Sequence, residues 1–189
     1  MTKSQKIAKI ISEVFNGFLT MVLSMIIPII FSNLNLQSKI IYSIIYALIP
    51  LVSYFTVKRY FKISDHDITD RRERPPFFIT LTALFGIMHV FIQAENIEML
   101  TNTSLALFAS TGVLTLITFF WKISGHMTFS TLLFSTIYYV TKSPYSLALF
   151  IFTPLIAWAR IELSKHTTPQ VIAGTIVTLA VSISIYFVF

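Results

Sequence analysis

The sequence predicts an all-α protein, a polytopic transmembrane helical bundle of about seven helices. The 189 residues are 55% hydrophobic and 12% charged, and the mean hydropathy is +0.77. A soluble domain of this length could not bury that much apolar surface in one core. Apolar stretches of about 16 to 20 residues recur along the chain, close to the length that crosses a bilayer. Too few residues remain for a second domain, so we expect 1–189 to form a single transmembrane domain.

Seven spans are expected, joined by short connections except for the segment 58–76. The basic N-terminal stretch MTKSQKIAKI runs into the first span without a small-residue cleavage site, which favours a retained first helix over a signal peptide. Pro28, Pro50 and Pro154 fall within spans, where proline kinks a helix. The expected spans are Val14–Phe31, Ile40–Val57, Phe77–Ala94, Ser104–Trp121, Met127–Val140, Tyr145–Ala159 and Val171–Phe189.

The distribution of basic residues predicts the orientation. With seven spans, the connections 58–76, 122–126 and 160–170 return to the side of the N-terminus. Of the 14 lysines and arginines, all but Lys39 and Lys142 fall on that side. The positive-inside rule then predicts a multi-pass protein of the cell membrane with a cytoplasmic N-terminus and an external C-terminus. The same rule accounts for the net charge of +6 without nucleic acid as a partner.

Three polar clusters share the predicted cytoplasmic side although they lie far apart in the sequence. They are Asp65–Pro76, Lys122–His126 and Arg160–Gln170. Each precedes a span, and the residues at the junctions suit the start of a helix. Pro75 and Pro76 fit a first turn, Ser124 and Gly125 can start the fifth span, and Thr168 and Pro169 are the expected N-cap and N1 pair of the seventh.

Helix N-termini present unpaired N–H groups and a partial positive charge, which together bind anions. The planar guanidinium groups of Arg74 and Arg160 suit phosphate oxygens. A neutral histidine can attack phosphorus and a second one can protonate the leaving oxygen, which gives roles to His166 and His126. The clusters therefore predict a phosphate pocket at the cytoplasmic end of the bundle, beside lipid.

The same residues resemble the signature of the type 2 phosphatidic acid phosphatase (PAP2) superfamily over positions 65 to 175. That signature is Lys-x6-Arg-Pro, then Pro-Ser-Gly-His, then Ser-Arg-x5-His-x3-Asp. The chain has Arg74-Pro75 in the first block and Ile123-Ser124-Gly125-His126 in the second. The third block reads Ala159-Arg160-x5-His166-x3-Gln170, followed by a family-like Val171-Ile172-Ala173-Gly174.

The resemblance implies a PAP2-like core and a lipid phosphatase that works without a metal cofactor. His166 would be the nucleophile and His126 the general acid, while Arg74, Arg160 and the Ser124–Gly125 backbone would hold the phosphate. Two positions depart from the family pattern. Gln170 replaces the aspartate that orients the nucleophile, and Asp67 replaces a lysine for which Arg71 and Lys122 are candidate substitutes. The substrate class is a phosphatidate-like lipid or a polyprenyl diphosphate.

Two other functions remain open from the sequence. The acidic run Asp65–Asp70 is similar to the Asp-rich stretches of UbiA-type prenyltransferases, so Asp67 and Asp70 could hold Mg²⁺ against a diphosphate. Alternatively, Gln170 and Asp67 could mark a degenerate member that binds a phospholipid head group without cleaving it. His89, in the middle of the third span, is expected to be a buried packing group.

Overall fold

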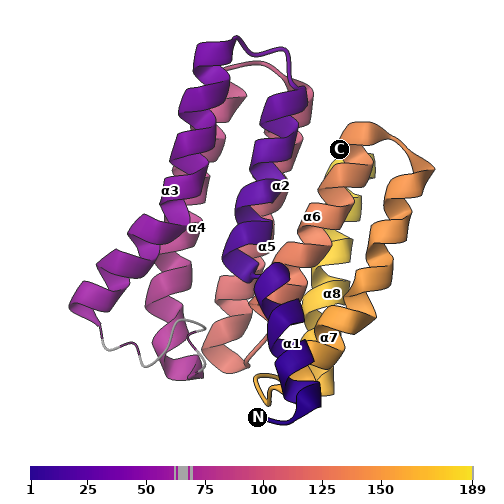
Figure 1. Ribbon diagram of the computed structural model, residues 1–189. Helices are drawn as coiled ribbons and strands as arrows, with labels where there is room; N and C mark the ends of the chain where they lie inside the picture. The colour runs from indigo at the N-terminus through magenta and orange to yellow at the C-terminus, as the bar shows by residue number, and fades with distance from the viewer. Residues whose placement is uncertain (62, 64–67, 69, 189) are drawn as a thin grey trace.

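The computed structural model describes residues 1–61, 63, 68 and 70–188, and its regular elements are all helices. Figure 1 shows them as a bundle of roughly upright helices, with the N-terminus at the lower end and the C-terminus towards the upper end. The α-helices are α1 (Lys3–Val14), α2 (Gly17–Phe31), α3 (Leu36–Tyr60), α4 (Arg74–Gln93), α5 (Glu98–Phe120), α6 (Gly125–Thr141), α7 (Phe152–Glu162) and α8 (Thr168–Ile183). Three shorter helical segments complete the described elements: η1 (Arg71–Glu73), η2 (Pro144–Ile151) and η3 (Ser184–Val188).

Six stretches of the described chain are long and apolar enough to cross a membrane, which fits a multi-pass membrane protein. They are Lys3–Phe31, Leu36–Tyr60, Arg71–Gln93, Glu98–Phe120, Pro144–Glu162 and Thr168–Phe187. The remaining helix, α6, has 17 residues and packs against α2, α5, α7 and α8. Because its neighbours cover it, α6 has buried hydroxyl side chains, such as those of Thr131 and Ser135, between the helices.

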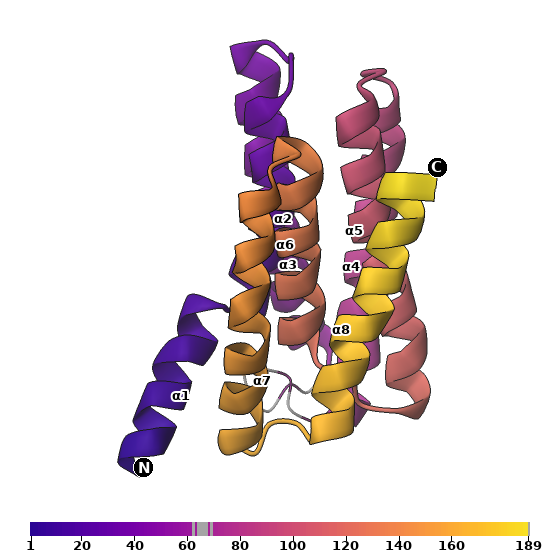
Figure 2. The ribbon, with the colours of Figure 1, turned by 90° about the vertical axis from the view of Figure 1, so that its right-hand side faces the viewer.

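The first predicted span was wrong at its start, because the chain breaks at Asn16. The Asn16 side chain caps α2 by accepting a hydrogen bond from the Phe18 N–H at 2.8 Å, so α1 and α2 are separate helices. Figure 2 shows α1 slanting away from the bundle axis at the lower end. On α1, Ala8 and Ser12 are buried and lie four residues apart on one face.

The sixth predicted span is also not a single α-helix. It begins as the 3₁₀ segment η2 and continues as α7 from Phe152. Pro154 lies in the first turn of α7, where its missing N–H costs no helical hydrogen bond. Pro28 and Pro50 lie inside α2 and α3 as predicted, and Figure 1 shows α3 changing direction along its length.

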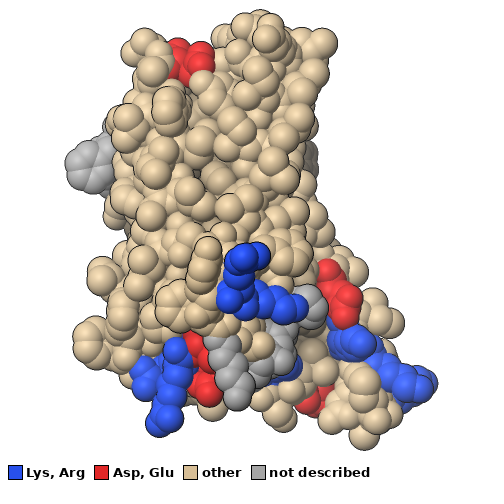
Figure 3. All heavy atoms as spheres, turned by 90° about the vertical axis from the view of Figure 1, so that its left-hand side faces the viewer, with Lys and Arg blue, Asp and Glu red and all other residues tan. Residues whose placement is uncertain are grey.

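The N-termini of α4, α6 and α8 lie at the same end of the bundle as α1 (Figures 1 and 2). This is the shared end that the sequence predicts for the three polar clusters. On the face drawn in Figure 3, lysine and arginine side chains lie in the lower half, and acidic side chains lie both there and near the top. Positive charge is therefore confined to the lower part of this face, as the positive-inside rule predicts for one end of a membrane bundle.

One close approach between helices lies beside the site, and a second polar contact lies away from it. Gly174 of α8 lies so close to α6 that an added Cβ would stand 2.9 Å from the Ser124 carbonyl oxygen, so only glycine permits this approach. In the last turns of α4, His89 Nδ1 lies 2.8 Å from the Ser104 hydroxyl of α5. His89 is therefore a buried packing group, as predicted.

Candidate functional site

A cavity opens at the lower end of the bundle, where α2, α4, α6, α7 and the connection before α8 meet. Its volume is about 50 Å³, several times the roughly 10–15 Å³ that one water molecule needs. One part of its wall is polar and is drawn from all three sequence clusters: Arg74, Gly125, His126, Arg160 and His166. The rest is largely apolar and includes Phe18, Met21, Phe77, Phe78 and Phe129. The cavity therefore combines a cationic head with an apolar flank.

Two buried arginines form the cationic head. Arg74 is 4% exposed and Arg160 is 2% exposed. Arg74 Nη1 donates to the Ile123 carbonyl at 2.7 Å, and its guanidinium lies over the Phe78 ring at 5.2 Å. These contacts fix the guanidinium at the N-terminus of α6. An arginine carries five N–H donors in a planar fork, a geometry that suits phosphate oxygens.

The hydrogen bonds of Gln170 determine the tautomer of His166. Gln170 Oε1 accepts the Thr167 backbone N–H at 3.1 Å, which identifies this atom as the amide oxygen. The same oxygen lies 3.2 Å from His166 Nδ1. Since a carbonyl oxygen can only accept, Nδ1 of His166 carries the proton and donates it. In the neutral ring, Nε2 of His166 then holds the lone pair that a nucleophile needs.

The surroundings of His166 keep its imidazole neutral. Burial, together with the positive charges of Arg74, Arg160 and Lys122, lowers the pKa of His166 to about 2, against the opposing hydrogen bond from Gln170. The three cations that disfavour a proton here favour an anion at the same place. The site is therefore electrostatically suited to a phosphate group.

This environment predicts an unusual titration. The folded chain disfavours protonation of His166, whereas the unfolded chain does not. The contribution of the neutral ring to folding stability is therefore fully present above the ordinary histidine pKa of 6.5, and it is lost as the pH falls towards about 2. We expect ¹⁵N NMR of histidine-labelled protein to show His166 neutral while ordinary histidines titrate. Inorganic phosphate should raise its pKa, because an adjacent anion stabilises the imidazolium. A midpoint near 6.5 without ligand would contradict the environment described.

His126 contacts the second arginine. Arg160 Nη1 lies 3.4 Å from His126 Nε2, and a guanidinium can only donate. His126 therefore presents a lone pair at Nε2 and has its proton on Nδ1 in this state. For His126 to act as an acid through Nε2, Arg160 must shift its donor to another acceptor, and a phosphate oxygen would be a stronger one.

Ser124 and Gly125 lie at the start of α6, and only Gly125 lines the cavity. Ser124 is the N-cap of α6, as predicted, and its hydroxyl accepts from the Met127 N–H at 3.4 Å. Its own N–H donates to the Gln170 carbonyl at 3.3 Å. The Ser124 amide thus joins α6 to α8, and the backbone groups at the cavity are those of the first turn from Gly125 onward.

Lys122 and Arg71 do not line the cavity. Lys122 Nζ donates to the Lys165 carbonyl at 2.7 Å, and it acts on His166 through its electric field. Arg71 Nη1 donates to the Phe119 carbonyl at 2.5 Å, where it satisfies the last carbonyls of α5. Of these two predicted replacements for the family's lysine, Lys122 is the one that acts on the site electrostatically.

The predicted start of α8 was wrong by one residue. Thr167 is the N-cap, and Thr168 and Pro169 are the first two helical residues. The shift follows from Gln170, which reaches back as the third helical residue to the Thr167 N–H in the manner of a capping box. Gln170 thus holds both the helix start and the His166 ring with one oxygen atom.

Most of the acidic run lies outside the described residues, including Asp65 and Asp67. Asp70 is described, and it caps η1 by accepting the Arg72 N–H at 2.9 Å. Within the same stretch of sequence, Ile68 is buried and lines the cavity. Among the residues that the structure describes, no group of three or more His, Cys, Asp or Glu side chains could hold a metal ion.

Ser12 is the polar residue that the sequence interpretation missed. Its hydroxyl accepts from Arg160 Nη1 at 2.6 Å across 148 positions of sequence. The burial of Ser12 on the same face of α1 as Ala8 is the structural basis of this contact. In the sequence, Ser12 stands out only as a small polar residue four positions after Ala8 in a basic segment. That pattern was too weak to indicate a partner.

The fold and the site define a multi-pass helical membrane protein with a cationic, histidine-containing cavity at one end of its bundle. No protein-family model, curated protein or solved structure matches the chain.

Proposed function

We propose that the protein hydrolyses the phosphate or diphosphate ester of a membrane lipid through a phosphohistidine on His166. One observation carries the proposal: a buried, neutral His166 with its lone pair on Nε2 lines the same cavity as two buried arginines. A neutral imidazole is a nucleophile, and fixed guanidinium groups stabilise the charge that develops on phosphoryl oxygens. Its PAP2-like motif residues support the same reaction.

The reaction has two steps. When the substrate takes over the Arg160 contact, His126 takes up a proton on Nε2. His166 Nε2 attacks phosphorus, the bond from phosphorus to the oxygen of the leaving group breaks, and His126 donates that proton to the departing oxygen. Water then attacks phosphorus, the phosphorus–nitrogen bond breaks, and the water proton passes to His126 while inorganic phosphate leaves. Arg74 and Arg160 hold the non-bridging oxygens throughout, and most of the catalysis comes from that positioning and charge.

The apolar flank indicates what carries the phosphate. Phe18, Phe77 and Phe129 line the cavity beside the arginines, and these aromatic surfaces suit an alkyl chain. We therefore propose a phosphatidate-like lipid or a polyprenyl diphosphate as substrate, with the head group at the three helix N-termini. Charge asymmetry supports a cytoplasmic position for the N-terminus and this cavity, with the C-terminus outside.

This orientation can be tested because the chain has no cysteine. Ser164→Cys lies in the exposed connection before α8, at the cavity end, and Asn96→Cys lies in the exposed connection between α4 and α5. In intact cells, we expect a membrane-impermeant maleimide to label the Asn96 variant and to label the Ser164 variant only after permeabilisation. The reverse pattern would place the cavity outside.

The covalent intermediate gives the direct test of the proposal. Purified protein would be mixed with ³²P-labelled phosphatidate or farnesyl diphosphate and quenched in alkali, where a phosphoimidazole survives, or in acid, where it hydrolyses. We expect alkali-stable, acid-labile label on the protein and phosphate release that persists in EDTA. Diphosphate release that requires Mg²⁺ and gives no labelled protein would instead support prenyl transfer or cyclisation through Asp67 and Asp70.

Gln170 supports a second candidate, a protein that binds a phospholipid head group without cleaving it. Its amide holds the His166 ring at 3.2 Å but brings no negative charge to stabilise a ring that becomes cationic. A bound lipid phosphate without release or labelling would favour this function.

Gln170→Glu is expected to raise the rate of phosphate release by about 10- to 100-fold, the usual size of effects from groups that orient a ligating or reacting histidine. Glutamate has the same shape, so its oxygen keeps both the His166 and the Thr167 contacts, and its charge favours the α8 N-terminus. The measurement is the single-turnover rate, with Gln93→Glu as a control for an exposed amide at the opposite end. An unchanged rate would show that charge on this partner does not limit catalysis.

A further inference from the structure

A second cavity lies behind Arg160 and His126, on the side of α1. Its volume is about 280 Å³, and Arg160 and His126 line both cavities. These two side chains, in which Arg160 Nη1 lies 3.4 Å from His126 Nε2, thus form part of the wall of both cavities. An anion held by Arg160 can be reached from either side of this pair.

The linings of the two cavities differ in chemistry. The first has the aromatic flank described above, whereas the second is lined by Lys9, Ser12 and Glu13 of α1 and by Leu163 and Lys165 beyond α7. Among the described lining residues, Lys9 and Lys165 are positively charged in addition to Arg160, and Glu13 is negatively charged. Lys9 forms an ion pair with Glu13 at 4.0 Å, but its side chain is 61% exposed, so water screens this pair strongly.

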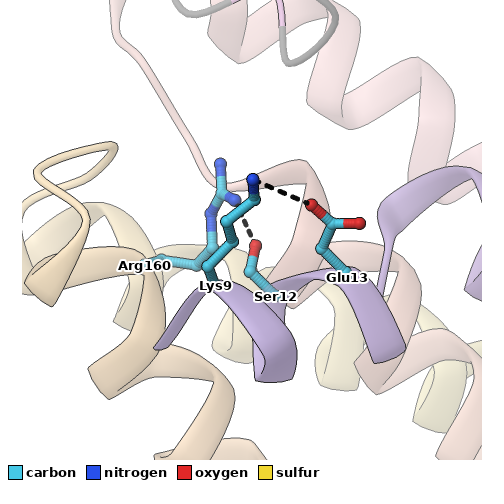
Figure 4. A network of polar contacts seen from close by, with 4 residues as sticks. All are labelled: Lys9, Ser12, Glu13 and Arg160. Atoms are coloured by element: carbon cyan, nitrogen blue, oxygen red, sulfur yellow. Dashed lines mark hydrogen bonds and ion pairs between the residues drawn. The ribbon is translucent and has the colours of Figure 1, made fainter. Parts of the chain in front are cut away.

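Helix α1 forms the outer wall of the second cavity. Figure 4 shows Lys9, Ser12 and Glu13 on α1 beside the Arg160 side chain, with Ser12 directed at the guanidinium. The 2.6 Å contact between Ser12 Oγ and Arg160 Nη1 anchors this helix to the site. Both α1 and the connection 163–167 lie at the charged end of the bundle (Figure 2), so this cavity faces the aqueous side.

We propose that the second cavity is a vestibule that binds inorganic phosphate, and that phosphate exchanges between the water and Arg160 along it. This inference rests on the proposed function for its role as product exit: a lipid in the aromatic cavity blocks that side, so phosphate must leave by another. Lys9 and Lys165 attract the dianion, and Arg160 passes it between the two cavities. The vestibule also gives water access to His126.

The test uses a single cysteine at Leu163→Cys, inside the vestibule, in the otherwise cysteine-free chain. We expect inorganic phosphate to slow labelling of this cysteine by a small hydrophilic maleimide. Adding Lys9→Gln with Lys165→Gln should raise the phosphate concentration for half-protection about fivefold, as expected for two partly screened charges. Lys3→Gln with Lys6→Gln, on the same helix but outside the lining, is the matched control and should leave it unchanged.

Labelling requires no turnover, so it separates this inference from the phosphatase proposal. Protection in a protein that releases no phosphate would support the vestibule and oppose the phosphatase. The vestibule is overturned if phosphate gives no protection, or if the control pair weakens protection as much as the Lys9 and Lys165 pair. In an active protein, the inhibition constant of inorganic phosphate should rise by the same factor in the Lys9 and Lys165 variant.

Discussion

His166→Ala is expected to abolish phosphate release, with a loss of at least about 10⁴-fold, because it removes the nucleophile of the proposed mechanism. Phosphate binding should survive the change. Arg74 and Arg160 remain in the cavity, and the neutral imidazole that is removed contributes no attraction for the anion. The measurements are the single-turnover rate and equilibrium binding of inorganic phosphate in detergent.

His89→Ala provides the matched control, since it also removes a buried histidine from the same bundle. His89 contacts Ser104 and lies outside the cavity lining, so its loss should leave the rate constant per folded molecule unchanged. His126→Ala should fall between the two, with a loss of about 10²- to 10⁴-fold for a general acid. Full release by the His166 variant would contradict the phosphohistidine mechanism.

The sequence predicted the bundle because a transmembrane span requires an uninterrupted apolar stretch of sufficient length, which can be read directly from the sequence. The cores of the expected spans agree with α2 to α8, and the alternation of spans brought the three polar clusters to one end. Helix ends were predicted where a local cap decides them, as at Ser124 before α6. The start of α8 was missed because it is determined by a side chain inside the helix, that of Gln170, which binds the Thr167 N–H.

The break between α1 and α2 shows a different limit of the sequence. Basic and apolar residues at the N-terminus are compatible with one long helix, and the Asn16 cap that interrupts it is a weak signal by itself. What makes α1 a separate element is its contact with α7 through Ser12 and Arg160, and a contact across 148 residues leaves no local trace in the sequence.

The sequence predicted which residues lie at the candidate site better than it predicted the contacts that they make. Motif spacing placed Arg74, His126, Arg160 and His166 together, and all four line one cavity. It also suggested Arg71, which the folded chain uses to satisfy carbonyl groups of α5. Arg71 and Arg74 are only three residues apart in the sequence. Their side chains contact different parts of the protein because Arg71 lies in η1 and Arg74 begins α4.

Arg160→Ala should cause the second large loss, about 10²- to 10³-fold in kcat/KM, the size reported by removal of one strong donor to a developing oxyanion. Arg160 is buried, it contacts both His126 and Ser12, and it lines both cavities. Its removal should therefore weaken inorganic phosphate binding as well as turnover, unlike the removal of His166. This difference separates a phosphate ligand from a nucleophile.

Arg160→Lys distinguishes charge from geometry. A lysine keeps the positive charge but has no planar fork with which to contact Ser12, His126 and a phosphate at once. We therefore expect Arg160→Lys to recover only a small part of the activity that Arg160→Ala loses. Ser12→Ala should have a milder effect than either, because it leaves the guanidinium in place. Thermal unfolding of each variant in detergent would identify any that lose activity by losing their fold. Full recovery by lysine would mean that the positive charge of residue 160 suffices and that its hydrogen bonds to α1 and α6 do not contribute to turnover.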